Sequence, residues 1–153
     1  MAKLCSKCGA TGGFLQGLKF TTINHFEYCP DCAQKYFDNV MRTIRLTTTN
    51  NIDGYLVKNY VDIASVEVVI GTGVFTEFGG DISDFFGARS TGFEVKLQKA
   101  KEAALARLKF IAFEKAGDGA AVVGVDLDYT EFSGNRIGVI ANGTIVELQE
   151  IGK

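Results

Sequence analysis

The spacing of apolar residues predicts one long helix in the second half of the chain. From Phe93 to Lys115 the apolar positions form two stripes when each residue is turned by about 100°, and Gly117 ends the pattern. One stripe, expected to pack on a sheet, comprises Phe93, Leu97, Ala100, Ala104, Leu108 and Ile111, and the other comprises Ala103, Ala106, Phe110 and Phe113. A helix with two apolar faces needs two partners. A neighbouring subunit is favoured as the second partner over a loop or the N-terminal segment, because Phe110 and Phe113 would otherwise form an exposed patch.

Segments rich in Val and Ile predict a sheet beside this helix. Residues 55–71, "YLVKNYVDIASVEVVIG", and residues 120–129, "AAVVGVDLDY", have the composition of strands. Residues 136–149, "RIGVIANGTIVELQ", are interpreted as two short strands joined at Asn142-Gly143, a preferred pair for a type I′ turn. Residues 38–51 are interpreted as a connector that begins as a short helix. The order of these elements predicts an α+β domain.

The N-terminal segment predicts a small hairpin module. Residues 14–28, "FLQGLKFTTINHFEY", alternate in the manner of a hairpin. The candidates for a thin apolar layer are Phe14, Leu18, Phe20, Ile23, Phe26 and Tyr28. A segment of roughly 35 residues is too small to fold on its core alone. Another source of stability is therefore expected here.

Four cysteines supply that source. Cys5 and Cys8 stand in "LCSKCG", Cys29 and Cys32 stand in "YCPDCA", and the chain has no other cysteine. Two CxxC turns brought together by a short hairpin provide the closed four-thiolate shell that structural zinc prefers. Gly9 and the single proline, Pro30, suit the tight turns. One structural Zn²⁺ per chain, held by these four residues, is the predicted cofactor.

Redox or disulfide chemistry and another metal such as iron are the alternatives at these cysteines. The N-terminus "MAKLCSKCGA" has no apolar signal region, and no apolar run approaches the length of a membrane span. A cytoplasmic location is therefore expected, where thiols stay reduced or bind metal. His25, the only histidine, is expected on the hairpin surface rather than at the metal.

The charge pattern does not favour nucleic acid as a partner. The whole chain has a formal net charge of −2. Residues 1–45 have six cationic and three acidic residues, a balance of plus three, but no run of Lys or Arg. Binders of nucleic acid usually show a stronger basic footprint. A partner protein, or a purely structural role, is favoured for the cysteine module.

Residues 47 to 148 resemble the YbjQ family, small bacterial and archaeal proteins often labelled heavy-metal-binding. The matching stretches are, in order, "TTTNNIDGY", "VEVVIGTGVFTEF", "GARSTGFE", "KAKEAALARLKFIAFEKAGDGAAVVGVDLDY" and "GTIVEL". The resemblance implies a dodecin-like α+β subunit, in which one long helix wraps an antiparallel sheet, and assembly as a pentameric ring. It implies no established enzymatic activity. A ring agrees with a helix that has two apolar faces.

The stretch "GARSTGFE" contains the candidates for a ligand site. Arg89, Ser90 and Glu94 match the family, and capping by Ser90 or Thr91, with Glu94 near the positive end of the helix, explains these residue types without a ligand. The alternative is that Arg89 and Ser90 contact an anion or a neighbouring subunit. The chain departs from the family at Asp62, Val66 and Ser83-Asp84.

The ligand types in the second module do not suit a heavy metal. Residues 33–153 contain no Cys or His, and Met41 is their only sulfur, whereas soft metals prefer thiolate and imidazole. Asp126 and Asp128 lie on one face of a strand and could hold a hard cation, although a solvent-exposed face is the favoured interpretation. A heavy metal is therefore expected at the four cysteines.

No constellation of catalytic groups is marked out. The only histidine lies in the cysteine module, so the second module has no histidine base for a nucleophile. "GTG" at residues 71–73 lacks the third glycine of a dinucleotide fingerprint, because Thr76 occupies that position. Glu77, Asp81 and Asp84 are not paired by spacing. A non-enzymatic protein is expected.

The sequence thus predicts two modules: a four-cysteine zinc ribbon at residues 1–37, a linker at 38–46 and a YbjQ-like oligomerisation domain at 47–153. The predicted function is that of a zinc-binding homo-oligomeric scaffold or interaction protein, pentameric by resemblance, which presents its ribbons to a protein partner. Two alternatives stay open: a small-molecule or anion sensor with its ligand between subunits near Arg89, and nucleic-acid binding through the ribbon.

Overall fold

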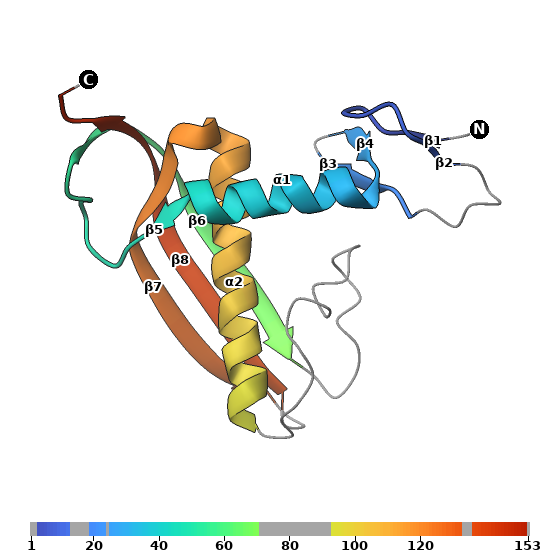
Figure 1. Cartoon of the computed structure of the whole chain (residues 1–153). Helices are drawn as coiled ribbons and strands as arrows, with labels where there is room; N and C mark the ends of the chain where they lie inside the picture. Colours follow the sequence, from blue (N-terminus) through green and yellow to red (C-terminus); the bar gives the residue numbers. More distant parts are fainter. Residues whose placement is uncertain (1–2, 13–18, 24, 71–92, 133–135, 153) are drawn as a thin grey trace.

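A computed structural model of the chain describes residues 3–12, 19–23, 25–70, 93–132 and 136–152. The elements are β1 (Lys3–Leu4), β2 (Thr11–Gly12), β3 (Thr21–Ile23), β4 (Phe26–Tyr28), α1 (Pro30–Thr43), β5 (Arg45–Leu46), β6 (Tyr55–Ile70), α2 (Phe93–Ala116), a 3₁₀ turn η2 (Gly117–Gly119), β7 (Ala120–Phe132) and β8 (Arg136–Glu150). The chain is therefore of mixed α+β class, with one long helix beside a sheet (Figure 1).

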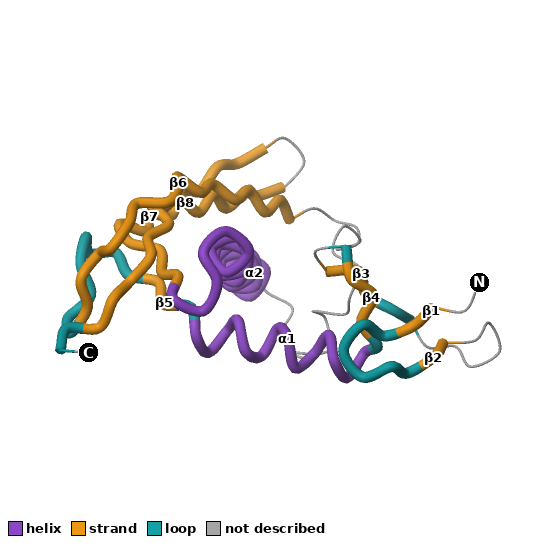
Figure 2. The backbone as a smooth tube through the Cα atoms, turned by 90° about the horizontal axis from the view of Figure 1, so that it is seen from above, coloured by secondary structure: helices purple, strands orange, loops and turns teal. Residues whose placement is uncertain are grey.

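The main sheet has the strand order β5-β7-β8-β6. β8 pairs antiparallel with both β6 and β7, and β5 adds a short parallel pair to β7. Two small antiparallel pairs, β1-β2 and β3-β4, form the N-terminal part. Figure 2 shows α2 end-on between the sheet and α1, so the fold has three layers: sheet, α2 and α1.

The core lies between the sheet and α2. Ala100, Ala104 and Leu108 of the predicted sheet-facing stripe are fully buried, and Leu97 and Ile111 pack beside them. Gly117 has a φ of +68°, the left-handed conformation that ends many helices. The predicted helix and its end are confirmed, and so is the sheet-facing stripe from Leu97 to Ile111; the side chain of Phe93 lies outside the described part of the structure.

The turn predicted at Asn142-Gly143 is wrong, because β8 continues through both residues from Arg136 to Glu150. Gly143 lies where the register of β7 shifts between Val123 and Asp126, which marks a β-bulge. A Cβ on Gly143 would collide with the side chain of Val122. The glycine is needed here for a close approach of two strands rather than for reversal of the chain.

The predicted connector 38–51 does begin as helix, because residues 38–43 are the end of α1, and a short strand and a loop follow. α1 begins at Pro30 rather than near residue 38 and runs to Thr43, and Val40 and Ile44 are buried in the main core. A proline suits the first turn of a helix, because its missing N–H would have no partner there. The segment between the cysteines and the sheet is therefore packed against the domain.

The second stripe of α2 is partly covered within the chain. The Phe110 ring lies 5.9 Å from that of Tyr36 and 5.6 Å from that of Phe37, and the Phe113 ring lies 5.5 Å from that of Tyr36. Tyr36 and Phe37 belong to α1. The premise that Phe110 and Phe113 would form an exposed patch without a neighbouring subunit is therefore wrong, because α1 packs against both rings.

Candidate metal centre

The first pair of cysteines is held by a tight turn between β1 and β2. Cys5 N–H donates to the Ala10 carbonyl at 2.8 Å, and Gly9 N–H donates to the Cys5 carbonyl at 2.9 Å. Gly9 has a φ of +73°, which a residue without a Cβ adopts at little cost. The turn thereby brings Cys5 and Cys8 to one side of the backbone.

The second pair lies at the beginning of α1. Cys29 is the N-cap residue, and its carbonyl accepts the first hydrogen bond of the helix from Ala33 N–H at 2.9 Å. Cys32 lies in the first turn. The partial positive charge at a helix N-terminus favours nearby thiolates. The structure therefore presents this pair on a helix rather than on a second hairpin turn.

The two pairs are joined through β4. Ser6 N–H donates to the Glu27 carbonyl at 2.8 Å, and the Lys3 ammonium forms an ion pair with the Glu27 carboxylate at 3.2 Å. The Thr22 hydroxyl also donates to that carboxylate, and together with Lys3 it lowers the pKa of Glu27. These contacts hold the first turn against the strand that leads into Cys29.

The four sulfur atoms meet at one point. The Sγ atoms of Cys5, Cys8, Cys29 and Cys32 all lie within 4.8 Å of one another, and those of Cys8 and Cys29 are 3.6 Å apart. All four cysteines are free, and Cys8 is the exposed one. In a tetrahedral four-thiolate zinc site, sulfur atoms lie about 3.8 Å apart for Zn–S bonds of about 2.3 Å. The spacing fits one metal ion.

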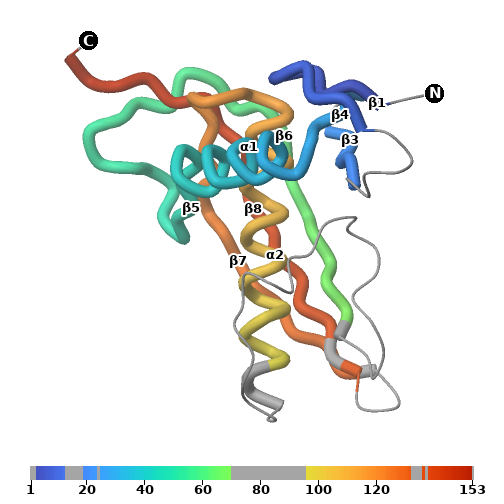
Figure 3. The backbone as a smooth tube through the Cα atoms, turned by 45° about the vertical axis from the view of Figure 1, so that its right-hand side comes forward, coloured from blue at the N-terminus to red at the C-terminus, as the bar shows by residue number. Residues whose placement is uncertain are grey.

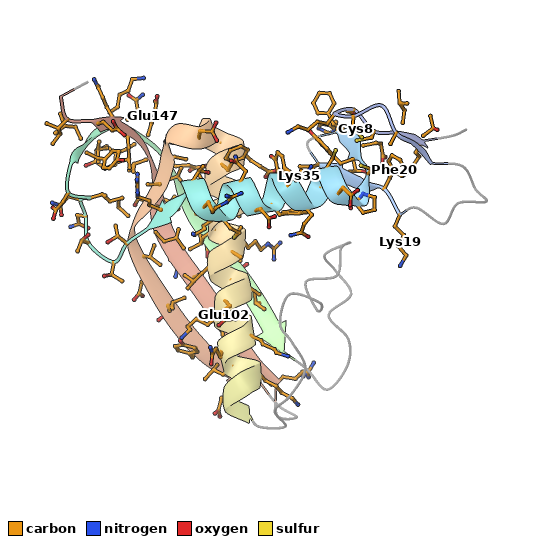
Figure 4. All side chains as sticks on the ribbon, viewed as in Figure 1. Cys8, Lys19, Phe20, Lys35, Glu102 and Glu147 are labelled. Atoms are coloured by element: carbon orange, nitrogen blue, oxygen red, sulfur yellow. The ribbon has the colours of Figure 1, made fainter. Side chains whose placement is uncertain are left out.

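Apolar side chains cover three of the four cysteines. Phe20, Tyr28 and Ala10 pack against Cys5, Cys29 and Cys32. Gly12 leaves room for the Phe20 ring, which a Cβ there would meet. Figure 4 labels Cys8 and Phe20 at this end of the molecule, and Figure 3 shows it at the end of α1 opposite β5.

The four thiols do not ionise with equal ease. Backbone N–H donation from Cys29 lowers the pKa of Cys5 to about 6, so this thiol ionises readily. Hydrogen bonding to Cys29 and Cys8 raises the pKa of Cys32 to about 12, because a second thiolate beside the first is unfavourable. Four adjacent thiolates need a metal ion to balance their charge.

The other predicted ligands do not join this site. Asp126 and Asp128 are exposed on β7, as the solvent interpretation expected. His25 is exposed with a φ of +68° in the turn between β3 and β4. Arg89 and Ser90, with Glu77, Asp81 and Asp84, lie outside the described residues. Within the described ranges, the four cysteines are the only group of three or more potential metal ligands brought together.

Comparison with known proteins identifies the family of the second module. The profile of the YbjQ family, described as "Putative heavy-metal-binding", matches residues 44–149. The chain belongs to the YbjQ family. A UPF0145 protein of Bifidobacterium longum is 38% identical over 107 residues, which are 69% of this chain and 96% of that protein. A UPF0145 protein of Anoxybacillus flavithermus is 36% identical over 105 residues, 69% of this chain and 98% of that protein.

The solved structure of a protein of unknown function from Pediococcus pentosaceus covers 69% of this chain and 98% of its own, with 19% identity and a TM-score of 0.41. The YbjQ match begins at Ile44, after the last cysteine and at the end of α1. The four-cysteine cluster thus lies outside the part of the chain that its YbjQ relatives share. In the described part of the chain, no helix is long and apolar enough to cross a membrane.

Proposed function

We propose that this protein is a non-enzymatic, zinc-binding member of the YbjQ family, in which a structural four-thiolate zinc site anchors an added module to the domain. The observation that carries this proposal is the double role of α1. Its N-terminal end holds Cys29 and Cys32, and its C-terminal end contributes Val40 and Ile44 to the core. One helix therefore connects the metal centre to the YbjQ domain.

The donor set supports zinc as the metal. Four thiolates in a closed shell favour zinc or iron, and zinc is the usual choice for structural sites. A cluster of this size, built on strands of two or three residues, gains little from burial alone. Zinc binding contributes on the order of 10 kcal/mol to the folding of such modules.

Metal analysis of the protein purified without added metal tests the proposal. We expect one zinc ion per chain by elemental analysis. Native mass spectra should show the mass of one zinc ion added to each chain. Cys5→Ser should remove the metal and lower the melting temperature, whereas the neighbouring Ser6→Ala should change neither. One iron per chain would refute zinc, and a metal-free protein with paired cysteines would refute the site.

We further propose that the protein is a homo-oligomer, pentameric as the family resemblance implies, and that it displays the cysteine modules to a protein partner. β6 supports the self-association. It is the outer strand of the described sheet and has large exposed apolar side chains, among them Tyr60 and Ile63, which are 74% and 79% exposed. A long apolar edge strand is a common site of association.

A further inference from the structure

A cavity of about 560 Å³ lies at the end of α1 that is opposite the cysteines. It is open to solvent, and its walls are the last turn of α1, β5, the loop 47–53 and Lys109 of α2. In Figure 1 this region lies where α1 leads into β5 and the loop that precedes β6. Cavities of this volume are in the range that holds small ligands.

The lining is strongly cationic. Arg42, Arg45 and Lys109 line the cavity against a single carboxylate, Asp53. None of the three ion pairs found among the described residues includes any of these four groups. The cavity therefore concentrates a formal charge of plus two, which a bound anion would neutralise.

Lys109 is the most confined of these cations. Its side chain is partly buried, and burial lowers its pKa. Its ammonium donates to the Met41 carbonyl, in the last turn of α1, at 2.8 Å. An ammonium has three N–H donors. This bond therefore uses one donor of Lys109 and leaves two for other acceptors.

The arginines are oriented by contacts that leave donors unused. The Arg45 guanidinium lies 4.4 Å from the centre of the Tyr55 ring, a stacking arrangement that leaves the N–H groups at its edge available. Arg42 Nε donates to the Asp38 carbonyl at 3.3 Å, which leaves its two terminal nitrogens. Guanidinium groups with free edges bind phosphate in a bidentate manner.

The loop 47–53 is held by hydrogen bonds within it and to β7. The Thr49 hydroxyl donates to the Asn51 carbonyl, so the 2.7 Å bond between Thr47 and Thr49 uses the Thr47 proton. Backbone bonds from Gly124 and Val125 hold the loop on the bulge of β7. Because the threonine protons are used within the loop, the cations and not the hydroxyls are the donors for an anion.

We propose that this cavity binds the phosphate group of a small ligand through Arg42, Arg45 and Lys109. Ile44, Leu46 and Ile52 add apolar lining, which suits the organic part of a phosphate ester. Arg42 precedes the YbjQ match, whereas Arg45 and Lys109 lie inside it. The site is therefore complete only when α1 is seated on the domain.

Calorimetric titration of the full-length, metal-loaded protein tests this proposal. The probes are inorganic phosphate, a nucleoside monophosphate and sodium chloride of matched ionic strength. We expect saturable binding of a phosphate probe but not of chloride, and about tenfold or greater weakening in Arg45→Gln and in Arg42→Gln, for one lost charged contact. The control is Lys35→Gln, which removes one charge from an exposed position of α1, the helix that contains Arg42. This variant should bind the phosphate probe with an affinity within twofold of the wild type.

Lys109→Gln should show the same weakening, but it also removes a bond to α1, so the two arginine variants decide the outcome. Tighter binding of the ester than of inorganic phosphate assigns the cavity to an organic phosphate, and equal binding assigns it to the free anion. The absence of saturable binding overturns the proposal. Equal affinity of the wild-type protein and both arginine variants also overturns it. Either result leaves the zinc proposal intact, because metal content is measured separately.

Discussion

At the scale of single residues, Asp62 shows how one side chain ties α2 to the sheet. Its carboxylate forms an ion pair with Lys115, in the last turn of α2, with 2.6 Å between Oδ2 and Nζ. The other carboxylate oxygen accepts a hydrogen bond from the N–H of Ile63. These contacts lower its pKa. A carboxyl group with a lowered folded-state pKa stabilises the protein above its unfolded pKa of about 3.9, and this stabilisation is lost as the pH falls through the folded-state pKa.

Asp62→Asn should therefore lower the free energy of unfolding at pH 7 by a small amount, and the difference from the wild type should shrink as the pH falls below the unfolded pKa and through the lower folded-state pKa. Denaturant titrations of both proteins between pH 2.5 and pH 7 measure this. Asp126→Asn is the control, because it removes an exposed carboxylate that forms none of the ion pairs found in the described part of the chain. A difference that persists at the lowest pH would contradict the ion-pair explanation.

Gly143 is the second residue whose role can be isolated. Gly143→Ala should lower the free energy of unfolding by about 1–3 kcal/mol, the usual cost of overpacking, because the new methyl group would collide with Val122. The double variant Gly143→Ala with Val122→Ala also removes the obstructing side chain. Its loss in free energy of unfolding should be smaller than the sum of the losses in the two single variants. Chemical denaturation of the four proteins measures this coupling. Strict additivity would show that the bulge does not depend on the close approach.

At the scale of elements, α1 determines how the cysteine module meets the domain. Its apolar residues Ala33, Tyr36, Phe37, Val40, Met41 and Ile44 recur at helical spacing. That signal is in the sequence, but residues 38–51 are predicted to contain only a short helix at their start, and the beginning of α1 at Pro30 is missed. Long, periodic segments such as α2 and β6 were predicted well, since their patterns extend over many residues.

The residues of the candidate metal site could be predicted from the sequence, but its local geometry could not. The CxxC spacing predicted four cysteines at one centre, and the sulfur positions agree. That the second pair sits at the start of a helix required recognition of Pro30 as a first-turn residue. Asn142-Gly143 was misinterpreted because local turn preference does not reveal a bulge in the neighbouring strand. The proposed anion-binding cavity is lined by residues 42–53 and by Lys109, which are far apart in the sequence, so no local sequence pattern reveals it.

Tyr36 and Phe113 allow a direct test of the seating of α1. Their rings meet edge to face with centroids 5.5 Å apart. Tyr36→Ala and Phe113→Ala should each lower the free energy of unfolding by about 2–4 kcal/mol, with a coupling of about 0.5–1.5 kcal/mol in the double variant. The control is Phe26→Ala, which removes an aromatic ring that is 56% exposed on β4 and should cost less than 1 kcal/mol, about the value for a surface change. A coupling near zero would mean that α1 is not packed on α2 in solution.

At the scale of the whole molecule, the proposed oligomer raises the question of which surface would join its subunits. Phe110 and Phe113 do not identify it, because they pack against α1 and their replacement by Glu would unseat that helix. β6 and the free part of β7 differ in character. β7 presents Asp126, Asp128 and Glu131 to solvent, and charges of this kind protect an edge from pairing. β6 also exposes charged side chains, but it has more large exposed apolar side chains, Leu56, Tyr60, Val61, Ile63 and Val69, than β7, where Tyr129 is exposed.

Ile63→Lys should therefore dissociate the proposed oligomer and leave the subunit folded. Ile63 is 79% exposed in the single chain, so the charge costs little there, but it would be desolvated in an interface. Native mass spectrometry and light scattering measure the subunit count, and circular dichroism checks the fold. Phe26→Lys is the matched control, since it places the same charge at an exposed apolar position of the cysteine module and should leave the assembly intact. If Ile63→Lys retains the wild-type mass, the subunits meet elsewhere; if the wild-type protein is itself a monomer, the proposed ring is refuted.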